Sequence, residues 1–371
     1  MGINKKEFPG QSKGMKKYLL PILFLSPAAH SALPEDVKIG GFIDTYYAWD
    51  FNHPKDHERK FTTQPVRHNE FNVNLAYIDA TIKREKTRGR LALQYGQSVT
   101  KNTAAEPRQG QTSGPQDAKV FQEAFVGKRL GEKTWIDGGI FLGNIGAESW
   151  ISKDNYTYTR ALNLDYVPYY SAGVRLEHEL SEKETVQLQV LNGWQNMSED
   201  NHGKAIGMQY KRTVSEKTVF TYNNFFGDEE QTFPAPRFRA YHNFILNHRA
   251  SADWQFVGAI DVGHQAQKKN DGVDAWFATT FTARRVLTEI DSVSGRLEWY
   301  NDRHEANVRT DSPNGFSVAG ASVNFDRKLD ETSLWRTELR GFYAKDEIYP
   351  QGTNRFQRLN GFLLTSFSLW F

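Results

Sequence analysis

The densest group of side chains suited to chemistry lies in the segment 144–168. Acidic, basic and aromatic residues are gathered there in one short stretch: Glu148, Trp150, Lys153, Asp154, Tyr156, Tyr158 and Arg160. Charges of both signs beside aromatic ring faces can attract, orient or repel charged solutes. The set therefore favours recognition of solutes over the making and breaking of bonds.

A second group of polar residues recurs at every other position in segments that are otherwise apolar. Period-two alternation places such residues on one face of a β-strand and the apolar residues on the other. Each charged pair could be a salt bridge that stiffens a sheet, whereas the polar face as a whole indicates contact with water. The residues concerned are Arg90 and Gln94, Arg175 and Glu177, Gln187 and Gln189, Arg296 and Glu298, and Arg336, Glu338 and Arg340.

Signs of catalysis or of a bound metal are weak. The chain has no cysteine, which excludes disulfides, iron–sulfur clusters and thiol chemistry. After residue 31 no G-x-S-x-G motif occurs, and no phosphate-loop, dinucleotide or zinc-finger spacing occurs in the sequence. His53, Asp56 and His57 have a spacing that suits a metal ion, but a solvated loop explains them better. We expect no catalytic residue, no metal site and no cofactor.

The elements that must position the charged residues are strands. Sixteen segments show strand-like patterns, and several of them alternate clearly. The segments are 37–51, 69–83, 88–99, 118–130, 134–144, 169–180, 184–194, 204–213, 218–227, 237–249, 253–264, 274–286, 291–301, 315–326, 332–344 and 359–371.

Three of these segments define the expected faces. In 37–51 the apolar face carries Val37, Ile39, Ile43, Tyr47, Trp49 and Phe51, and in 69–83 it carries Phe71, Val73, Leu75 and Tyr77. In the final segment Leu363, Phe367, Leu369 and Phe371 share a face, with Thr365 as its one polar member. A chain end that is apolar to its last residue is unusual in a soluble protein, because termini usually lie exposed at the surface.

The connections between the segments alternate in length. After the even-numbered segments they are short and polar, as in Glu85–Thr87, Gly131–Lys133, Ser181–Lys183 and Ser215–Lys217. After most odd-numbered segments they are longer and richer in Pro, Gly, Asn and Asp, as in 52–68, 101–117, 144–168, 302–314 and 345–358. Short turns at one end and long loops at the other are typical of outer-membrane β-barrels, and a β-sandwich gives no reason for this asymmetry.

The N-terminal region has the form of a secretory signal peptide. Lys16 and Lys17 precede an apolar stretch from Tyr18 to Leu25, and Ala29-His30-Ser31 offers a small-residue cleavage site. We predict a signal peptide over residues 1–31, with Met15 as an alternative true start and Ala32 as an alternative cleavage point. Removing residues 1–31 leaves 41 basic and 43 acidic side chains, a formal charge of −2, so nothing favours nucleic acid as a partner.

Composition agrees with a barrel rather than with membrane helices. Mean hydropathy is −0.64, and after the signal peptide no run of about 18 apolar residues occurs. Aromatic residues make up 13% of the chain, which suits the aromatic girdles at the two edges of a transmembrane barrel. The prediction is an all-β, transmembrane, antiparallel up-and-down barrel of about 16 strands over residues 32–371. A barrel of that size leaves an aqueous channel.

Several motifs resemble those of one family. They are Asp50-Phe-Asn52 with Pro54, Asn69-Glu-Phe-Asn-Val-Asn-Leu-Ala76, Gln122-Glu-Ala-Phe-Val-Gly127, Trp135-Ile-Asp-Gly-Gly-Ile140, Ser152-Lys-Asp-Asn-Tyr-Thr-Tyr-Thr-Arg160, Pro168-Tyr-Tyr170 with Gly173-Val-Arg175, and Val190-Leu-Asn-Gly-Trp194. Together they resemble the β-barrel porins of the OmpL-like type, densely over residues 40–210 and more thinly beyond. The resemblance implies an outer-membrane channel of a Gram-negative bacterium, without fixing its solute.

The resemblance also assigns roles to residues. The third long loop of well-studied porins folds into the barrel and narrows it, so we expect Glu148 and Asp154 to face Arg90 and its neighbours across a constriction. Arg175, Arg296, Arg336 and Arg340 are the other expected lumen residues, and Phe371 is the expected signal for the barrel assembly machinery. The alternative for the loop is that it caps the barrel or packs on a partner subunit.

The expected function is passive diffusion of ions and small hydrophilic solutes through a water-filled porin in the bacterial outer membrane. Outer-membrane lipid is the expected surrounding, and a homotrimer is one possible assembly. The alternative is an outer-membrane barrel with a closed lumen that acts as an adhesin or a barrel-embedded hydrolase. Stepwise currents in a planar bilayer separate the two.

Overall fold

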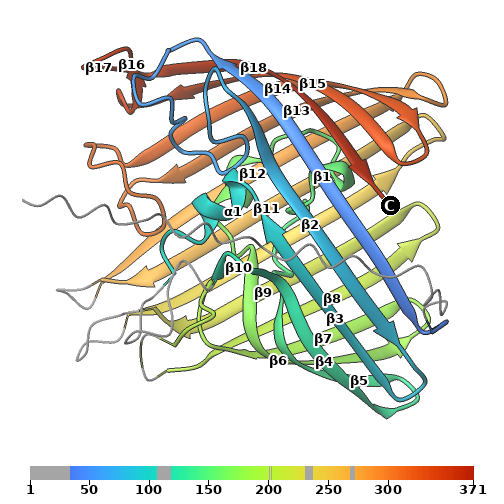
Figure 1. The fold of residues 1–371 in the computed structure, drawn as a ribbon. Helices are drawn as coiled ribbons and strands as arrows, with labels where there is room; N and C mark the ends of the chain where they lie inside the picture. Colours follow the sequence, from blue (N-terminus) through green and yellow to red (C-terminus); the bar gives the residue numbers. More distant parts are fainter. Residues whose placement is uncertain (1–33, 107–117, 200, 202, 230–236, 268–271) are drawn as a thin grey trace, which may run out of the picture. The chain divides into compact units, whose positions relative to one another are not determined.

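The computed structural model describes residues 34–106, 118–199, 201, 203–229, 237–267 and 272–371. The predicted signal peptide, 1–31, lies outside these residues. Asp36–Phe371 form one compact unit, in which sixteen strands close into an antiparallel barrel (Figure 1). The barrel strands are β1 (Val37–Asp50), β2 (Phe71–Lys83), β3 (Thr87–Tyr95), β4 (Phe121–Gly131), β5 (Thr134–Leu142), β6 (Tyr170–Ser181), β7 (Glu184–Leu191), β8 (Ala205–Ser215), β9 (Thr218–Asp228), β10 (Phe238–Arg249), β11 (Trp254–Ala266), β12 (Val273–Val286), β13 (Asp291–Asp302), β14 (Phe316–Asp330), β15 (Ser333–Ala344) and β18 (Leu359–Trp370).

The last barrel strand closes the barrel on the first. β18 pairs antiparallel with β1, with Phe42 opposite Trp370 and Asp50 opposite Phe362. Every other barrel strand pairs with its neighbours in the chain. The predicted all-β, sixteen-stranded, up-and-down architecture is confirmed. A further two-stranded hairpin, β16 (Tyr349–Gln351) with β17 (Arg355–Gln357), lies within the last long loop.

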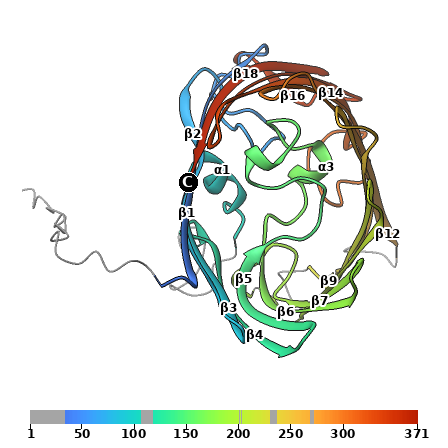
Figure 2. The same ribbon diagram turned by 90° about the vertical axis from the view of Figure 1, so that its right-hand side faces the viewer.

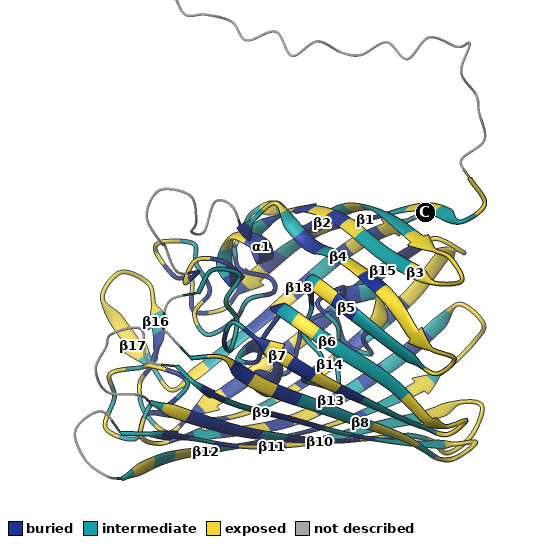
Figure 3. Cartoon of the chain, turned by 90° about the horizontal axis from the view of Figure 1, so that it is seen from below, coloured by how far each residue is buried: buried dark blue, intermediate teal, exposed yellow. Residues whose placement is uncertain are grey.

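The two faces of the wall differ as period-two alternation requires. On β1, Ile39 and Ile43 are exposed on the outside, whereas Phe42 and Asp44 are fully buried on the inside. On β18 the predicted outer residue Phe367 is 54% exposed, and Ser366 beside it is 1% exposed. Figure 3 shows the same alternation along several strands. An apolar outer face and a polar inner face are the pattern of a barrel that lies in lipid.

One predicted face is wrong. Phe71 and Val73 lie outside, opposite Tyr47 and Thr45, but Leu75 lies inside, opposite Asp44. A β-bulge inserts Asn74 between Val73 and Leu75, and an extra residue shifts every later side chain to the other face. Leu75 is therefore fully buried in the interior rather than exposed to lipid.

The third strand is also shorter than predicted. It ends at Tyr95, and α1 (Gln97–Asn102) follows instead of a strand that continues to residue 99. Gly96 between them has a φ of +145°, and a Cβ there would lie 2.2 Å from the carbonyl oxygen of Asn74. Glycine is the residue that tolerates this turn. It redirects the chain from the barrel wall into the interior.

Other helical segments are short. A 3₁₀ turn, η1 (Ser152–Asp154), and the short helix α3 (Leu162–Asp165) both belong to the connection between β5 and β6. No helix among the described residues is long and apolar enough to span a membrane.

Candidate functional site

The connection between β5 and β6, residues 143–169 and hereafter loop 3, lies inside the ring of strands (Figure 2). Its polar groups bond to wall strands far away in the chain. The amide nitrogen of Leu162 donates to Glu298, and the side chain of Asn163 donates to Asp261 at 2.5 Å. Thr159 donates through its amide nitrogen and its hydroxyl to Glu338. Loop 3 is therefore fixed against the inner wall along β11, β13 and β15.

Three inward arginines hold loop 3 to that wall. Arg296 lies 3.1 Å from Glu338 and 3.5 Å from Glu148 of the loop, and its Nη1 donates to the carbonyl oxygen of Thr159. Arg340 pairs with Glu298 at 2.8 Å. Arg336 pairs with Asp326 and donates to two loop carbonyl oxygens, those of Ser152 and Asn155.

All three arginines are at most 1% exposed. Charged groups so deeply buried need this dense pairing, because an unpaired charge is costly away from water. The sequence placed these arginines on the inner face correctly, but loop 3 covers them. We call the inner wall from β12 to β15, with the loop segment on it, the covered wall.

The opposite part of the inner wall, from β2 to β6, keeps contact with solvent. Here the side chains of Arg90 and Arg88 are 22% exposed, that of Arg175 is 17% exposed and that of Glu177 is 34% exposed. Arg90 pairs with Asp79 and Glu123, and both Arg88 and Arg175 pair with Asp137. We call this part the open wall.

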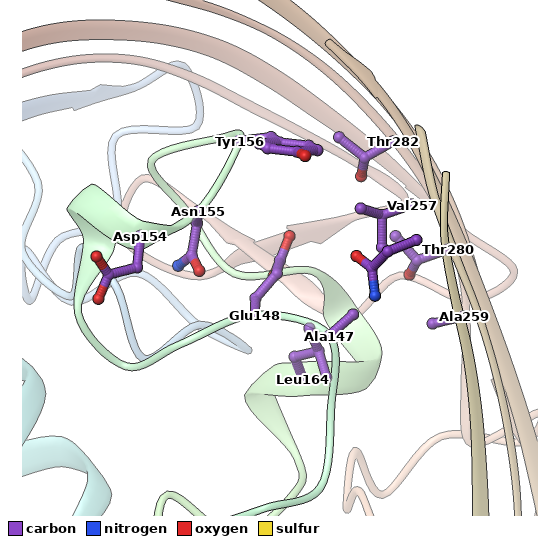
Figure 4. Close-up of a pocket in the computed structure, with 11 residues that line it drawn as sticks. Ala147, Glu148, Asp154, Asn155, Tyr156, Leu164, Val257, Ala259, Thr280 and Thr282 are labelled. Atoms are coloured by element: carbon purple, nitrogen blue, oxygen red, sulfur yellow. The ribbon is translucent and has the colours of Figure 1, made fainter. Parts of the chain in front are cut away.

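The two acidic residues predicted for the constriction both line a cavity between loop 3 and the wall, but they have different ion-pair partners. Glu148 lies toward the covered wall, beside a cavity of about 130 Å³ that Thr280 and Thr282 of β12 also line (Figure 4). It pairs with Arg296, not with Arg90 as the sequence suggested. Asp154 points away from β12 in Figure 4 and pairs with Lys153 at 2.7 Å. Its side chain is 45% exposed.

Two loop carboxyl groups have perturbed acidity. Burial raises the pKa of Glu148 above its ordinary value, although Arg296 opposes the shift. Burial likewise raises the pKa of Asp165, against the influence of Arg340 and of a hydrogen bond from Thr63. Both carboxyl groups belong to the internal packing of loop 3, which is why desolvation dominates them.

The first long loop also reaches into the interior. Arg59 is 2% exposed, lies 3.3 Å from Asp50 and stacks over the ring of Phe362 at 3.5 Å. Thr63 of the same loop donates to Asp165 of loop 3 at 2.5 Å. Sequence reasoning missed these contacts, because polar loop residues carry no periodicity that reveals which of them turn inward.

The histidines of the first loop gather at the barrel rim. The rings of His53 and His57 each lie within 5.7 Å of the ring of His68, and His53 and His68 also contact Trp49. Among the residues that the structure describes, no group of three or more His, Cys, Asp or Glu side chains could hold a metal ion. Aromatic packing accounts for the cluster.

Phe371 lies beside the first strand at the short-turn end of the barrel. Its carbonyl oxygen accepts a hydrogen bond from the amide of Gly41, its own amide donates to Gly41, and its side chain is on the outer face with 65% of the residue exposed. A Cβ on Gly41 would collide with the Phe371 ring. The glycine leaves room for the terminal aromatic ring.

Comparison with solved structures places the fold among outer-membrane channels. The anion-selective porin from Comamonas acidovorans is 9% identical, with a TM-score of 0.57 over 90% of this chain and 99% of that one. The trimer form of OmpT from Vibrio cholerae has a TM-score of 0.60 at 7% identity, over 90% of this chain and 99% of that one. The outer-membrane channel DcaP of Acinetobacter baumannii has a TM-score of 0.58 at 8% identity, over 90% of this chain and 97% of that one. Such low identities show a shared fold alone.

No curated protein matches this chain. A family profile does match, over residues 36–369, which is nearly the whole barrel. Its description is "putative beta-barrel porin-2, OmpL-like". The match agrees with the resemblance seen in the sequence, and it favours a channel over an enzyme. The chain belongs to this porin family.

Proposed function

We propose that the protein is a passive, water-filled diffusion channel for ions and small hydrophilic solutes in the bacterial outer membrane. The observation that carries the proposal is the contrast in exposure between the two walls. Arg88, Arg90 and Glu177 on the open wall remain partly exposed inside the barrel, whereas Arg296 and Arg336 on the covered wall do not. The solute path therefore runs between the open wall and the exposed residues of loop 3, such as Asp154.

The constriction of this path lies where the open wall approaches loop 3. Arg90 lies beside Tyr77, with 5.8 Å between the guanidinium carbon and the ring centroid. Asp154 of the loop acts electrostatically on the same tyrosine. An exposed carboxylate on the loop facing an arginine on the wall sets up a transverse field that selects solutes by charge and size. Asp154 and Arg90 are the proposed constriction residues, with Arg175 next to them on the wall.

Purified protein in a planar bilayer tests the channel. Stepwise current increments on insertion are expected, because each inserted water-filled barrel adds one conducting unit. The proposal that the protein is a channel would be contradicted by a protein that inserts into the bilayer but gives no current steps. Circular dichroism must show that this protein retains its β-structure.

A barrel with a closed lumen, acting as an adhesin or a barrel-embedded hydrolase, is the second candidate. The observation in its favour is the apolar packing between loop 3 and the wall, where Tyr158, Leu162 and Leu164 are buried together with Phe225 and Tyr300. The bilayer experiment decides between the two candidates, since a plugged barrel conducts nothing.

Export and assembly complete the proposal. Residues 1–31 serve as a signal peptide, and Phe371 serves as the signal for the barrel assembly machinery. Deleting Phe371 is expected to lower the amount of folded protein in outer-membrane fractions while leaving the conductance of the inserted channels unchanged. Normal insertion of the deletion variant would remove that role from Phe371. Outer-membrane lipid surrounds the barrel, and homotrimer formation is the proposed assembly, as in the trimer form of OmpT.

A further inference from the structure

Arg160 of loop 3 is a buried arginine without a protein acceptor among the described residues. The residue is 2% exposed, and its Nε and Nη1 atoms are buried with no hydrogen-bond partner. Its guanidinium carbon lies 3.9 Å from the centroid of the Tyr169 ring. The ring face attracts the cation, but it accepts none of the hydrogen bonds that a guanidinium can donate in its own plane.

The other deeply buried arginines all have acceptors. Arg296, Arg336 and Arg340 bond to carboxylates and loop groups, as described above. Arg59 donates to Asp50 and to the carbonyl oxygen of Pro65, and Arg239 donates to the side-chain oxygen of Gln265. Within the described residues, Arg160 therefore departs from the rule that this protein follows at its other buried arginines.

The nearby carboxylates are held by other groups. Glu148 accepts from the amide of Ala161 and pairs with Arg296. The Oδ1 atom of Asp165 accepts hydrogen bonds from the hydroxyl groups of Thr63 and Tyr169. Its Oδ2 atom has no hydrogen-bond partner and lies more than 4.0 Å from the guanidinium nitrogens of Arg160. Both carboxylates influence Arg160 only electrostatically. The Nε and Nη1 atoms of Arg160 therefore lack an acceptor among the described residues, and both atoms are buried.

We propose that Arg160, stacked on Tyr169, binds a small monovalent anion, either chloride or the carboxylate group of a small solute. A planar guanidinium with free in-plane donors suits both ligands, which share a single negative charge and a compact acceptor. The proposal rests on the proposed channel for the route by which the anion arrives. It adds a solute class, because a fixed positive charge in the interior of the barrel favours the passage of anions over cations.

The first test is thermal unfolding in detergent, which needs no current. Without added chloride, Arg160→Met is expected to unfold at the wild-type temperature or above it, since it removes buried donors that have no acceptor and keeps the length of the side chain. Added sodium chloride is expected to raise the unfolding temperature of the wild type more than that of Arg160→Met. Two results would overturn the proposed anion site. One is an equal rise in unfolding temperature on adding chloride to the two proteins, and the other is a large loss of stability in Arg160→Met without chloride.

The second test is the reversal potential of inserted channels in a potassium chloride gradient. The wild type is expected to prefer chloride, Arg160→Lys to keep most of that preference, and Arg160→Met to lose it. Arg309→Met is the matched control, because it removes an arginine that is 80% exposed in a long loop and should leave the preference unchanged. Unchanged selectivity in Arg160→Met would remove the site from the solute path.

The two tests separate the two proposals. If the protein gives no current, the channel fails, and the chloride dependence of unfolding still decides whether Arg160 binds an anion. If the protein conducts but neither the unfolding temperature nor the selectivity responds to Arg160→Met, the anion site fails and the channel stands. Replacing chloride by acetate in both tests tells a halide site from a carboxylate site.

Discussion

The covered wall and the open wall carry the same residue types and use them differently. Arg296 and Glu338 on the covered wall are fully buried and fix loop 3, whereas Arg90 and Glu177 on the open wall are partly exposed. The difference lies in what faces each wall, because alternation along a strand places both sets inside the barrel. Loop 3 thus turns one group of inward charges into a structural contact and leaves the arginines of the other partly accessible to solvent.

The largest effect is expected from Arg296→Met on the covered wall. The substitution leaves Glu338 and Glu148 buried without their cation, and breaking such a pair costs about 3–5 kcal/mol. Chemical unfolding in detergent should show a loss of that order, and bilayer recordings should show a larger, noisier conductance as loop 3 loosens. Arg327→Met, which removes one partner of an exposed ion pair with Asp291, serves as the control and should change little.

A smaller loss of stability and a clear effect on transport are expected from Arg90→Met on the open wall. The side chain of Arg90 is 22% exposed, but its partners Asp79 and Glu123 are only 12% and 7% exposed. The loss of stability should therefore be about 1–3 kcal/mol, the cost of leaving buried polar groups without a partner. Removing the cation leaves two carboxylates along the path, and the reversal potential should shift toward cation preference. If Arg90→Met destabilised the barrel as much as Arg296→Met, the distinction between the walls would be lost.

The smallest effect is expected from Asp154→Asn in the exposed part of loop 3. Asp154 is exposed, and its one ion pair among the described residues is with its neighbour Lys153, so the unfolding temperature should stay unchanged. Ion selectivity should shift modestly toward anions, because the substitution removes one negative charge from the constriction. Unchanged selectivity would exclude Asp154 from the constriction.

Much of the fold was predictable from the sequence, because a barrel in lipid imposes a strict period of two. That rule identified the strands and the inward direction of Arg90 and Arg296. It could not locate the bulge at Asn74, since one inserted residue leaves the local composition unchanged. It also could not foresee the turn at Gly96 into α1, because a glycine at the end of a strand fits many connections.

The site was only partly predictable, for a different reason. Alternation says which face a residue occupies but not what covers it, so Arg296 and Arg175 looked alike in the sequence. Their difference depends on contacts with loop 3 from residues such as Thr159, which are distant in the chain and have no regular spacing. The lack of hydrogen-bond acceptors around Arg160 likewise depends on the packing of loop 3 and has no signal in the sequence.

The central claim is that solutes pass along the open wall and not along the covered wall. The cysteine-free chain allows this to be tested by single cysteines at Glu177, which is partly exposed, and at Ser322, which is 5% exposed on the covered wall. A charged, thiol-reactive methanethiosulfonate is added to open channels in a planar bilayer. Glu177→Cys should react and show a stepwise fall in single-channel current, while Ser322→Cys should keep its full current. A block at Ser322→Cys together with no response at Glu177→Cys would contradict the account.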